Sequence, residues 1–270
     1  MILSCLKLCA SYGTKQVLKN ASLEVRPGDF ICVCGANGSG KSTFLKLLSG
    51  LERGKSQKSP SFLQIDSAEK MPSLTEDDGS RTVFLLDLPR REIARRIAFL
   101  PQSEFPAWDT TVFNMILTGR FASSGTSYTA EDYSRVKEAA RFLEITPLLE
   151  RSVFTLSGGE FQKCRIARAI AQQGEFLILD EPCAGLDINA ESALLKKMRI
   201  LSDGGKTGVV VSIHNINAAV RFTKKIALLS DGGIVCGSAE EVIVPKNITR
   251  AFGDGISVFT HPLWNCPQIG

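Results

Sequence analysis

The sequence predicts an α/β fold with a parallel sheet, a small antiparallel β subdomain and an inserted helical subdomain. Short apolar runs alternate with segments that favour helices, which is the pattern of β/α units. Residues 105–172 interrupt this alternation with a helical pattern, and two short strand-like runs come before it, within residues 2–26. These observations predict one sheet-based core that carries two smaller subdomains.

Residues 35–42 (GANGSGKS) match the phosphate-loop pattern G-x-x-x-x-G-K-[ST] at every fixed position. They follow the apolar run 30–34, an expected buried strand, and precede the helix-forming residues 43–48. The glycines let backbone N–H groups turn toward a phosphate, and Lys41 supplies a cation for the β- and γ-phosphates. A glycine-rich turn that binds nothing is the alternative, but the flanking strand and helix favour a nucleotide site.

Composition is that of an ordinary folded protein, since 44% of the 270 residues are hydrophobic and 22% are charged. The net charge of +4 is too small for the dense basic surface of a nucleic-acid-binding protein. Eight cysteines occur without a CxxC pair, which favours reduced thiols over disulfides. No apolar run reaches the roughly 18 residues of a membrane-spanning helix, so we expect any membrane association to go through a partner.

The first hundred residues give weaker signals. Strands are expected at 2–8 and 22–26, with Tyr12 as an exposed aromatic in a loop between them. Residues 54–81 contain many Ser, Pro and charged residues without periodicity, which predicts an exposed, mobile insertion. Strands follow at 83–86 and 97–100, and between them lie four arginines that we expect to form a solvated face: Arg90, Arg91, Arg95 and Arg96.

Later segments are more regular. Thr129 and Asp132 have the spacing of a capping box at the start of a helix. The β/α alternation then returns. The strand expected at 226–229 should form a hairpin with residues 234–236 across an Asp-Gly-Gly turn. The strands are expected at 176–179, 209–213 and 226–229, and the helices near 189–202 and 216–222.

Asp180 and Glu181 follow the apolar run 176–179, so two carboxylates are expected at the carboxyl end of a central strand. Open α/β sheets bind their ligands at that edge. Asp180 is suited to hold Mg²⁺ through water together with Ser42, and Glu181 to act as general base toward a water aligned with a γ-phosphate. Two solvated carboxylates would be the simpler interpretation if the chain had no phosphate loop.

Residues 156–160 (LSGGE) contain a second capping box, formed by Ser157 and Glu160. Gly158 and Gly159 would allow an anion to approach the helix N-terminus closely. A well-capped helix is the simpler interpretation, and a second phosphate site separate from Lys41 is the functional one.

Taken together, these motifs resemble those of the ATP-binding cassette (ABC) family. The phosphate loop, Gln102, LSGGE at 156–160, Asp180-Glu181, Gly185-Leu186-Asp187 and His214 follow one another in the family's order over nearly the whole chain. The resemblance implies a P-loop NTPase (RecA-like) core and a single ABC ATPase domain at 1–250. Within it the core would be 1–102 and 173–250, the helical subdomain 103–172 and the insertion 54–81, with a C-terminal tail at 251–270.

The resemblance also implies a role for each motif residue. Gln102, Glu181 and His214 would be catalytic, with Gln102 contacting Mg²⁺ or the attacking water and His214 the γ-phosphate. Mg²⁺ would be held by Ser42, Gln102 and Asp180. ATP would be bound by Tyr12, which stacks on adenine, by Gly35, Ala36, Asn37, Gly38, Ser39, Gly40, Lys41, Ser42 and Thr43, and from the other subunit by Ser157, Gly158, Gly159, Glu160 and Asp187.

Within the family, residues 95–102, 118–120 and 214–217 resemble the ATPases of iron-siderophore, haem and cobalamin importers. A zinc or manganese importer ATPase is an alternative, as is a non-transport member such as an iron-sulfur assembly ATPase. Cys183 and Lys163 depart from the usual Thr and Arg, at positions not expected to touch the phosphates.

The implied cofactors are ATP and Mg²⁺. The implied partners are a second copy of the subunit, forming a homodimer, a membrane permease and, indirectly, a substrate-binding protein, but no nucleic acid. The chain would be cytoplasmic and peripheral on the cytoplasmic face of the membrane. The permease is expected to dock in a groove between the Gln102 loop and residues 105–130, where Phe105, Trp108 and Phe113 supply aromatic side chains.

Overall fold

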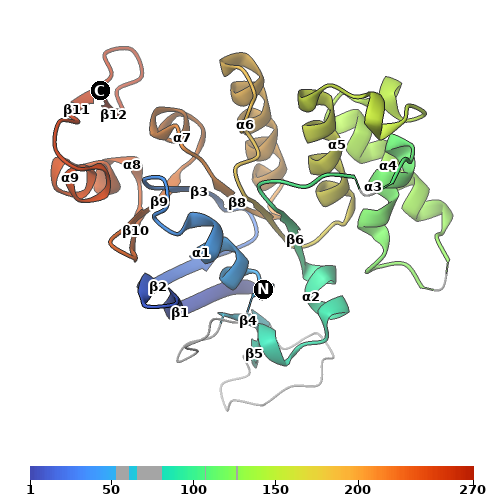
Figure 1. Ribbon diagram of the computed structural model, residues 1–270, viewed down its shortest axis with the longest axis horizontal. Coiled ribbons are helices and arrows are strands. Elements are labelled where there is room, and N and C mark those ends of the chain that lie inside the picture. Colours follow the sequence, from blue (N-terminus) through green and yellow to red (C-terminus); the bar gives the residue numbers. More distant parts are fainter. Residues whose placement is uncertain (53–60, 66–80, 107, 126) are drawn as a thin grey trace.

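The computed structural model describes residues 1–270 except 53–60, 66–80, 107 and 126 (Figure 1). Among the described residues the largest sheet has six strands in the order β10-β9-β3-β8-β7-β6, parallel throughout except for the β9–β10 hairpin. This arrangement confirms the predicted parallel sheet. Its strands are β3 (Phe30–Cys34), β6 (Ile97–Leu100), β7 (Phe176–Leu179), β8 (Gly208–Ser212), β9 (Lys225–Ser230) and β10 (Gly233–Gly237).

The central strands are buried along their whole length, as every residue of β3, β7 and β8 shows. Such continuous apolar runs suit a parallel sheet that is covered on both faces. Ile31 and Val33 pack with Phe44 of α1 (Lys41–Leu48) and with the antiparallel sheet. Cys32 and Cys34 belong to the core of the other face, which includes side chains of α6 (Ile188–Asp203) and α7 (Ile216–Phe222).

The inserted helical subdomain lies at one end of the molecule, beyond α6 and β6 (Figure 1). Its helices are α3 (Val112–Leu117), α4 (Ala130–Phe142) and α5 (Gly158–Ala171), and both predicted capping boxes are present. No helix in the described part of the chain is long and apolar enough to cross a membrane. The remaining helices are α2 (Arg90–Arg96), α8 (Ala239–Val242), α9 (Pro245–Phe252) and the 3-10 turns η1 (Leu85–Asp87), η2 (Thr118–Arg120), η3 (Thr146–Leu148) and η4 (Val153–Thr155).

The antiparallel sheet is larger than the sequence indicated. Its order is β2-β1-β4-β5, with β1 (Ile2–Tyr12), β2 (Lys15–Val25), β4 (Ser61–Ile65) and β5 (Arg81–Phe84). Tyr12 therefore ends a strand instead of lying in a loop. β4 lies inside the range 54–81, where we expected no regular structure, because it pairs with the distant β1. The other residues of that expected insertion, apart from Arg81 in β5, lie outside the described residues.

The arginines of α2 do more than form a solvated face. Arg91 and Arg95 each donate from Nε to the backbone carbonyl of Ala122 at 3.0 Å, and Arg91 also donates to the carbonyl of Ser124. Ala122 and Ser124 belong to the helical subdomain. These contacts connect α2 of the core with that subdomain.

The last twenty residues, expected as a tail, contain a hairpin of β11 (Val258–Thr260) and β12 (Pro267–Ile269). The side-chain amide of Asn217 in α7 donates to the carbonyl of Ile269 and accepts from its N–H, both at 2.9 Å. The His261 ring stacks on Trp264 at 3.9 Å between centroids. The hairpin is thereby attached to the helix that follows His214.

Candidate nucleotide site

The phosphate loop connects β3 to α1, and its glycines have conformations that other residues rarely adopt. Gly38 and Gly40 have φ angles of 72° and 102°. A Cβ on Gly40 would lie 2.5 Å from Val17 Cγ1, and a Cβ on Gly35 would lie 2.6 Å from the carbonyl oxygen of Leu229. The loop therefore requires glycine for both conformation and space.

Lys41 is buried below this loop, with 5% of its surface exposed. Its Nζ donates to the carbonyl oxygens of Gly35 at 2.9 Å and Ala36 at 3.1 Å. Burial lowers the pKa of the Lys41 ammonium, and the charge of Glu181 acts in the opposite direction. Among the described residues, the hydroxyl of Ser39 is buried without a hydrogen-bond partner. A cation beside an unsatisfied hydroxyl donor fits a phosphate group.

A cavity of about 620 Å³ opens over the loop and brings together ten of the predicted site residues. The sequence did not indicate two of its lining residues, Lys15 and Val17 of β2. A lysine three residues after Tyr12, in the same hairpin, was the available signal. The predicted residues that line the cavity are Tyr12, Asn37, Gly38, Gly40, Lys41, Ser42, Thr43, Gln102, Glu181 and His214.

Tyr12 stands beside the phosphate loop with 55% of its surface exposed. Its hydroxyl lies 3.3 Å from Thr43 Oγ1 and 3.4 Å from Glu52 Oε2. The ring is thus available to solvent while its tip is fixed next to α1. An exposed aromatic ring at the mouth of a phosphate site is suited to stack on a nucleobase.

Asp180 and Glu181 lie at the carboxyl end of β7, as predicted. Gln102 Nε2 donates to Glu181 Oε2 at 2.7 Å, and His214 Nε2 lies 2.6 Å from Glu181 Oε1. The family resemblance implied that Gln102 contacts the ion or water and that His214 contacts the γ-phosphate. In this structure both side chains contact the Glu181 carboxylate instead.

A magnesium ion has suitable oxygen ligands here. Asp180 is 1% exposed and does not line the cavity, but it directly precedes Glu181, which does. Ser42 and Gln102 line the cavity itself. A hydroxyl, a carboxylate and an amide oxygen are the hard donors that Mg²⁺ prefers, so the predicted set Ser42, Gln102 and Asp180 fits the ion.

Gly35, Ala36 and Ser39 belong to the phosphate loop but do not line the cavity. The predicted residues of 157–160 and Asp187 do not line it either. Ser157 begins α5 in a capping box with Glu160, and Asp187 begins α6 by accepting from the N–H of Ala190. A Cβ on Gly159 would lie 3.8 Å from Leu186, so the two helix starts are neighbours. Ser157, Gly158 and Asp187 are exposed and do not line the cavity.

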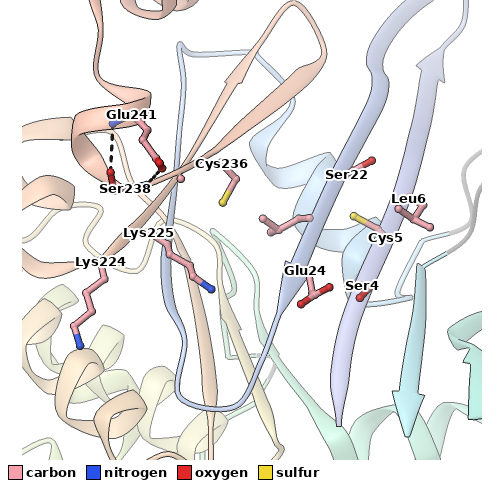
Figure 2. Close-up of a pocket in the computed structure, with 12 residues that line it drawn as sticks. Ser4, Cys5, Leu6, Ser22, Glu24, Lys224, Lys225, Cys236, Ser238 and Glu241 are labelled. Carbon is pink, nitrogen blue, oxygen red and sulfur yellow. Dashed lines mark hydrogen bonds between the residues drawn. The ribbon is translucent and has the colours of Figure 1, made fainter. Parts of the chain in front are cut away.

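A second cavity, of about 710 Å³, lies between β1, β2 and the β9–β10 hairpin (Figure 2). Its lining includes Cys5, Glu24, Lys225, Cys236 and Glu241. None of the predicted nucleotide or metal residues lines it, and it has no glycine loop. The smaller cavity over the phosphate loop is therefore the candidate nucleotide site.

A third cavity, of about 520 Å³, is lined by residues of the helical subdomain, among them Phe105 and Trp108. These side chains are 87% and 69% exposed. Phe113 does not line this cavity. It stacks on Tyr133 with centroids 5.8 Å apart and packs against the core, which agrees with a structural role inside the subdomain.

The loop at Gln102 is tied to α5 by two arginines whose role the sequence did not indicate. Arg168 donates to both carboxylate oxygens of Glu104 at 2.6 Å. Arg165 is 4% exposed and donates to the carbonyl of Pro101 and, at 2.6 Å, to Gln162 Oε1. The helix that begins at Ser157 is therefore joined to the loop beside Glu181.

Comparison with known proteins gives several extended similarities. Residues 18–184 match the family described as ABC transporter. The hemin import ATP-binding protein HmuV of Gloeobacter violaceus is 34% identical, over 94% of this chain and 88% of that protein. The manganese transport system ATP-binding protein MntB of Halalkalibacterium halodurans is 30% identical, over 94% of this chain and 92% of that protein. The zinc transport system ATP-binding protein TroB of Treponema pallidum is 29% identical, over 97% of this chain and 91% of that protein.

Solved structures show the same fold. An ABC transporter assigned to the metal-chelate type, in an inward-facing conformation, matches with a TM-score of 0.78 and 25% identity, over 99% of this chain and 95% of that one. A dimeric ATP-binding cassette in a post-hydrolysis state with ADP and Pi matches with a TM-score of 0.68 and 26% identity, over 87% and 98%.

Proposed function

The chain belongs to the ABC transporter family, and we propose that it is the subunit that binds and hydrolyses ATP to drive a membrane importer. The convergence of Tyr12, the phosphate loop, Gln102, Glu181 and His214 on one cavity carries this proposal. A base-stacking ring, a phosphate cradle and a carboxylate are the parts that a triphosphate hydrolase needs.

In this proposal the residues of the site bind the nucleotide and its ion or act on the attacking water. Lys41 exchanges the carbonyls of the loop for oxygens of the β- and γ-phosphates. Glu181 accepts the proton of the attacking water, and Gln102 and His214 orient its carboxylate until the nucleotide arrives. Mg²⁺ held by Ser42, Asp180 and Gln102 would neutralise charge on the phosphates. The cavity residues thus divide into binding groups and one general base.

Residues 157–160 and Asp187 complete the site of a second subunit. The exposure of Ser157, Gly158 and Asp187 and their separation from the cavity of their own chain support this arrangement. A helix N-terminus with two glycines suits the γ-phosphate of ATP bound to a partner. We propose a homodimer that closes over two ATP molecules, and the match to a dimeric cassette supports it.

The importer would place this subunit on the cytoplasmic face of a membrane, held there by permease subunits. A substrate-binding protein would act only through the permease. The third cavity, with Phe105 and Trp108 exposed at its rim, supports a docking site for the permease.

For the cargo, we propose a metal chelate such as haem, an iron-siderophore or cobalamin. The similarity to the HmuV protein and to the metal-chelate type transporter supports this choice. Free manganese or zinc is the second candidate, which the similarity to MntB and TroB favours. Uptake of labelled haem, cobalamin, Mn²⁺ and Zn²⁺ by vesicles containing the complete complex decides between them.

Replacing the general base tests the hydrolytic function. Glu181→Gln keeps the shape of the side chain, so ATP binding should remain while turnover falls by the roughly 10²- to 10⁴-fold that a general base provides. Glu52→Gln, at an acidic residue near Tyr12 but outside the carboxylate pair, is the matched control and should keep its turnover. Hydrolysis by Glu181→Gln at the wild-type rate would show that Glu181 is not the base.

A further inference from the structure

Ser212 ends β8 with a hydroxyl that contacts both residues at the end of β7. Its Oγ donates to Asp180 Oδ1 at 2.7 Å and accepts from the backbone N–H of Glu181 at 2.7 Å. The residue is 1% exposed. One buried hydroxyl therefore joins the proposed magnesium ligand to the backbone of the proposed general base.

This hydroxyl is unusual for its strand. Residues 209–211 are all valine and all fully buried, and a β-branched aliphatic residue is what packing alone favours at such a position. A buried hydroxyl costs free energy unless it is hydrogen-bonded. The two bonds of Ser212 satisfy that requirement, and both go to the carboxylate pair.

The backbone of Glu181 also requires support. Its φ angle of 49° lies in the left-handed region, which residues other than glycine rarely adopt. Gln102 and His214 hold the Glu181 carboxylate, while Ser212 accepts from its N–H. Backbone and side chain are thus fixed by different partners.

We propose that Ser212 is a positioning residue for ATP hydrolysis, which fixes Asp180 and the backbone of Glu181 relative to each other. The inference rests on the proposed ATPase function and deepens it. Ser212 does not line the nucleotide cavity, so its loss should impair the chemical step more than nucleotide binding. Loss of a residue that only packs the core would not impair the chemical step while sparing nucleotide binding.

Steady-state hydrolysis by the full chain tests this separation. In Ser212→Ala, kcat should fall by about 10- to 10²-fold, the scale of a 1 Å misplacement, while KM for ATP stays within about twofold. Ser212→Thr, which keeps the hydroxyl, should recover most of the lost kcat. Ser202→Ala is the matched control, because Ser202 is equally buried and donates to Arg199 in α6, away from the carboxylates.

A second measurement needs no nucleotide. Hydrogen exchange of the Glu181 amide, followed by NMR on chain labelled with ¹⁵N-glutamate, should be faster in Ser212→Ala and unchanged in Ser202→Ala. The proposal is overturned if Ser212→Ala keeps the wild-type kcat, if it raises only KM, or if the exchange rate does not change. Equal losses of kcat in the two alanine variants would also overturn it. A wild-type chain that hydrolyses no ATP overturns the proposed function, while the exchange rate still decides whether Ser212 holds Glu181.

Discussion

At the scale of single residues, Tyr12 offers a direct test of base stacking. Tyr12→Ala should weaken ATP binding by about 10- to 100-fold, since base–aromatic stacking contributes roughly 1–3 kcal/mol. Tyr12→Phe should bind like the wild type, because the hydroxyl contacts at 3.3 and 3.4 Å are long. Titration with a fluorescent ATP analogue measures both affinities. Equal affinity of the alanine variant and the wild type would contradict the stacking role.

The buried pair of Arg120 and Asp132 predicts a pH dependence of stability. Their side chains are 8% and 4% exposed, with Nε and Oδ1 2.8 Å apart. Burial acts to raise the pKa of Asp132, but hydrogen bonds from the Thr129 backbone and from Arg120 outweigh it and lower the pKa from 3.8 to about 2. A lowered carboxyl pKa stabilises the fold above the unfolded value, and this contribution disappears as the pH falls from about 4 toward 2.

Asp132→Asn should therefore lower the free energy of unfolding by about 3–5 kcal/mol at neutral pH, the cost of breaking a buried ion pair. The difference from the wild type should shrink below pH 4. Glu131→Gln is the matched control, because Glu131 pairs with Arg135 at a surface position where its side chain is 65% exposed. Urea denaturation over a pH series measures the differences, and a pH-independent gap between Asp132→Asn and wild type would refute the assignment.

The site residues that could be predicted from the sequence belong to motifs of neighbouring positions. The phosphate loop, the two capping boxes and Asp180-Glu181 each lie within a few neighbouring positions, and the described structure contains all of them. Ser212 gave no such signal. Its partner Asp180 is distant in sequence and meets it because β7 and β8 are neighbours in the sheet.

At the scale of elements, β4 is one of the strands that the sequence did not predict. Its residues have no apolar periodicity of their own, and their partner strand β1 begins about sixty positions earlier. The hairpin of β11 and β12 was missed for a similar reason, because Asn217 of α7 supplies its attachment. The strands of the parallel sheet were predictable because burial on both faces leaves a continuous apolar run.

The pairing of β4 changes what a deletion in this region should do. Ile65 pairs with Arg81, so replacing 66–80 by an Asn-Gly turn should preserve both β4 and β5 and leave the thermal midpoint nearly unchanged. Deleting 56–79 removes β4 and its pairing with β1, and should lower that midpoint. Calorimetry on the two variants decides, and equal midpoints would show that β4 does not contribute to stability.

At the scale of the whole molecule, Trp108 should contribute to the association with a permease. Trp108→Ala should weaken that association by about 2 kcal/mol or more, as for an aromatic hot spot. The ATP affinity set by Tyr12 and Lys41 should stay nearly unchanged. Trp264→Ala is the matched control, since Trp264 is 46% exposed but lies in the C-terminal hairpin. Unimpaired assembly in Trp108→Ala would remove it from the interface, and lost ATP binding would assign it to the fold.

The ties from α5 to the Gln102 loop have a thermodynamic consequence. Arg165 and Arg168 join the helix that begins at Ser157 to the backbone at Pro101 and to Glu104, and Glu104 and Arg168 also line the cavity beside Trp108. If a partner bound there favours one position of this helix, it alters ATP affinity by some factor. Linkage then requires ATP to alter the partner's affinity by the same factor. The coupling free energy between ATP and the partner can thus be measured by titrating either one in the presence and absence of the other.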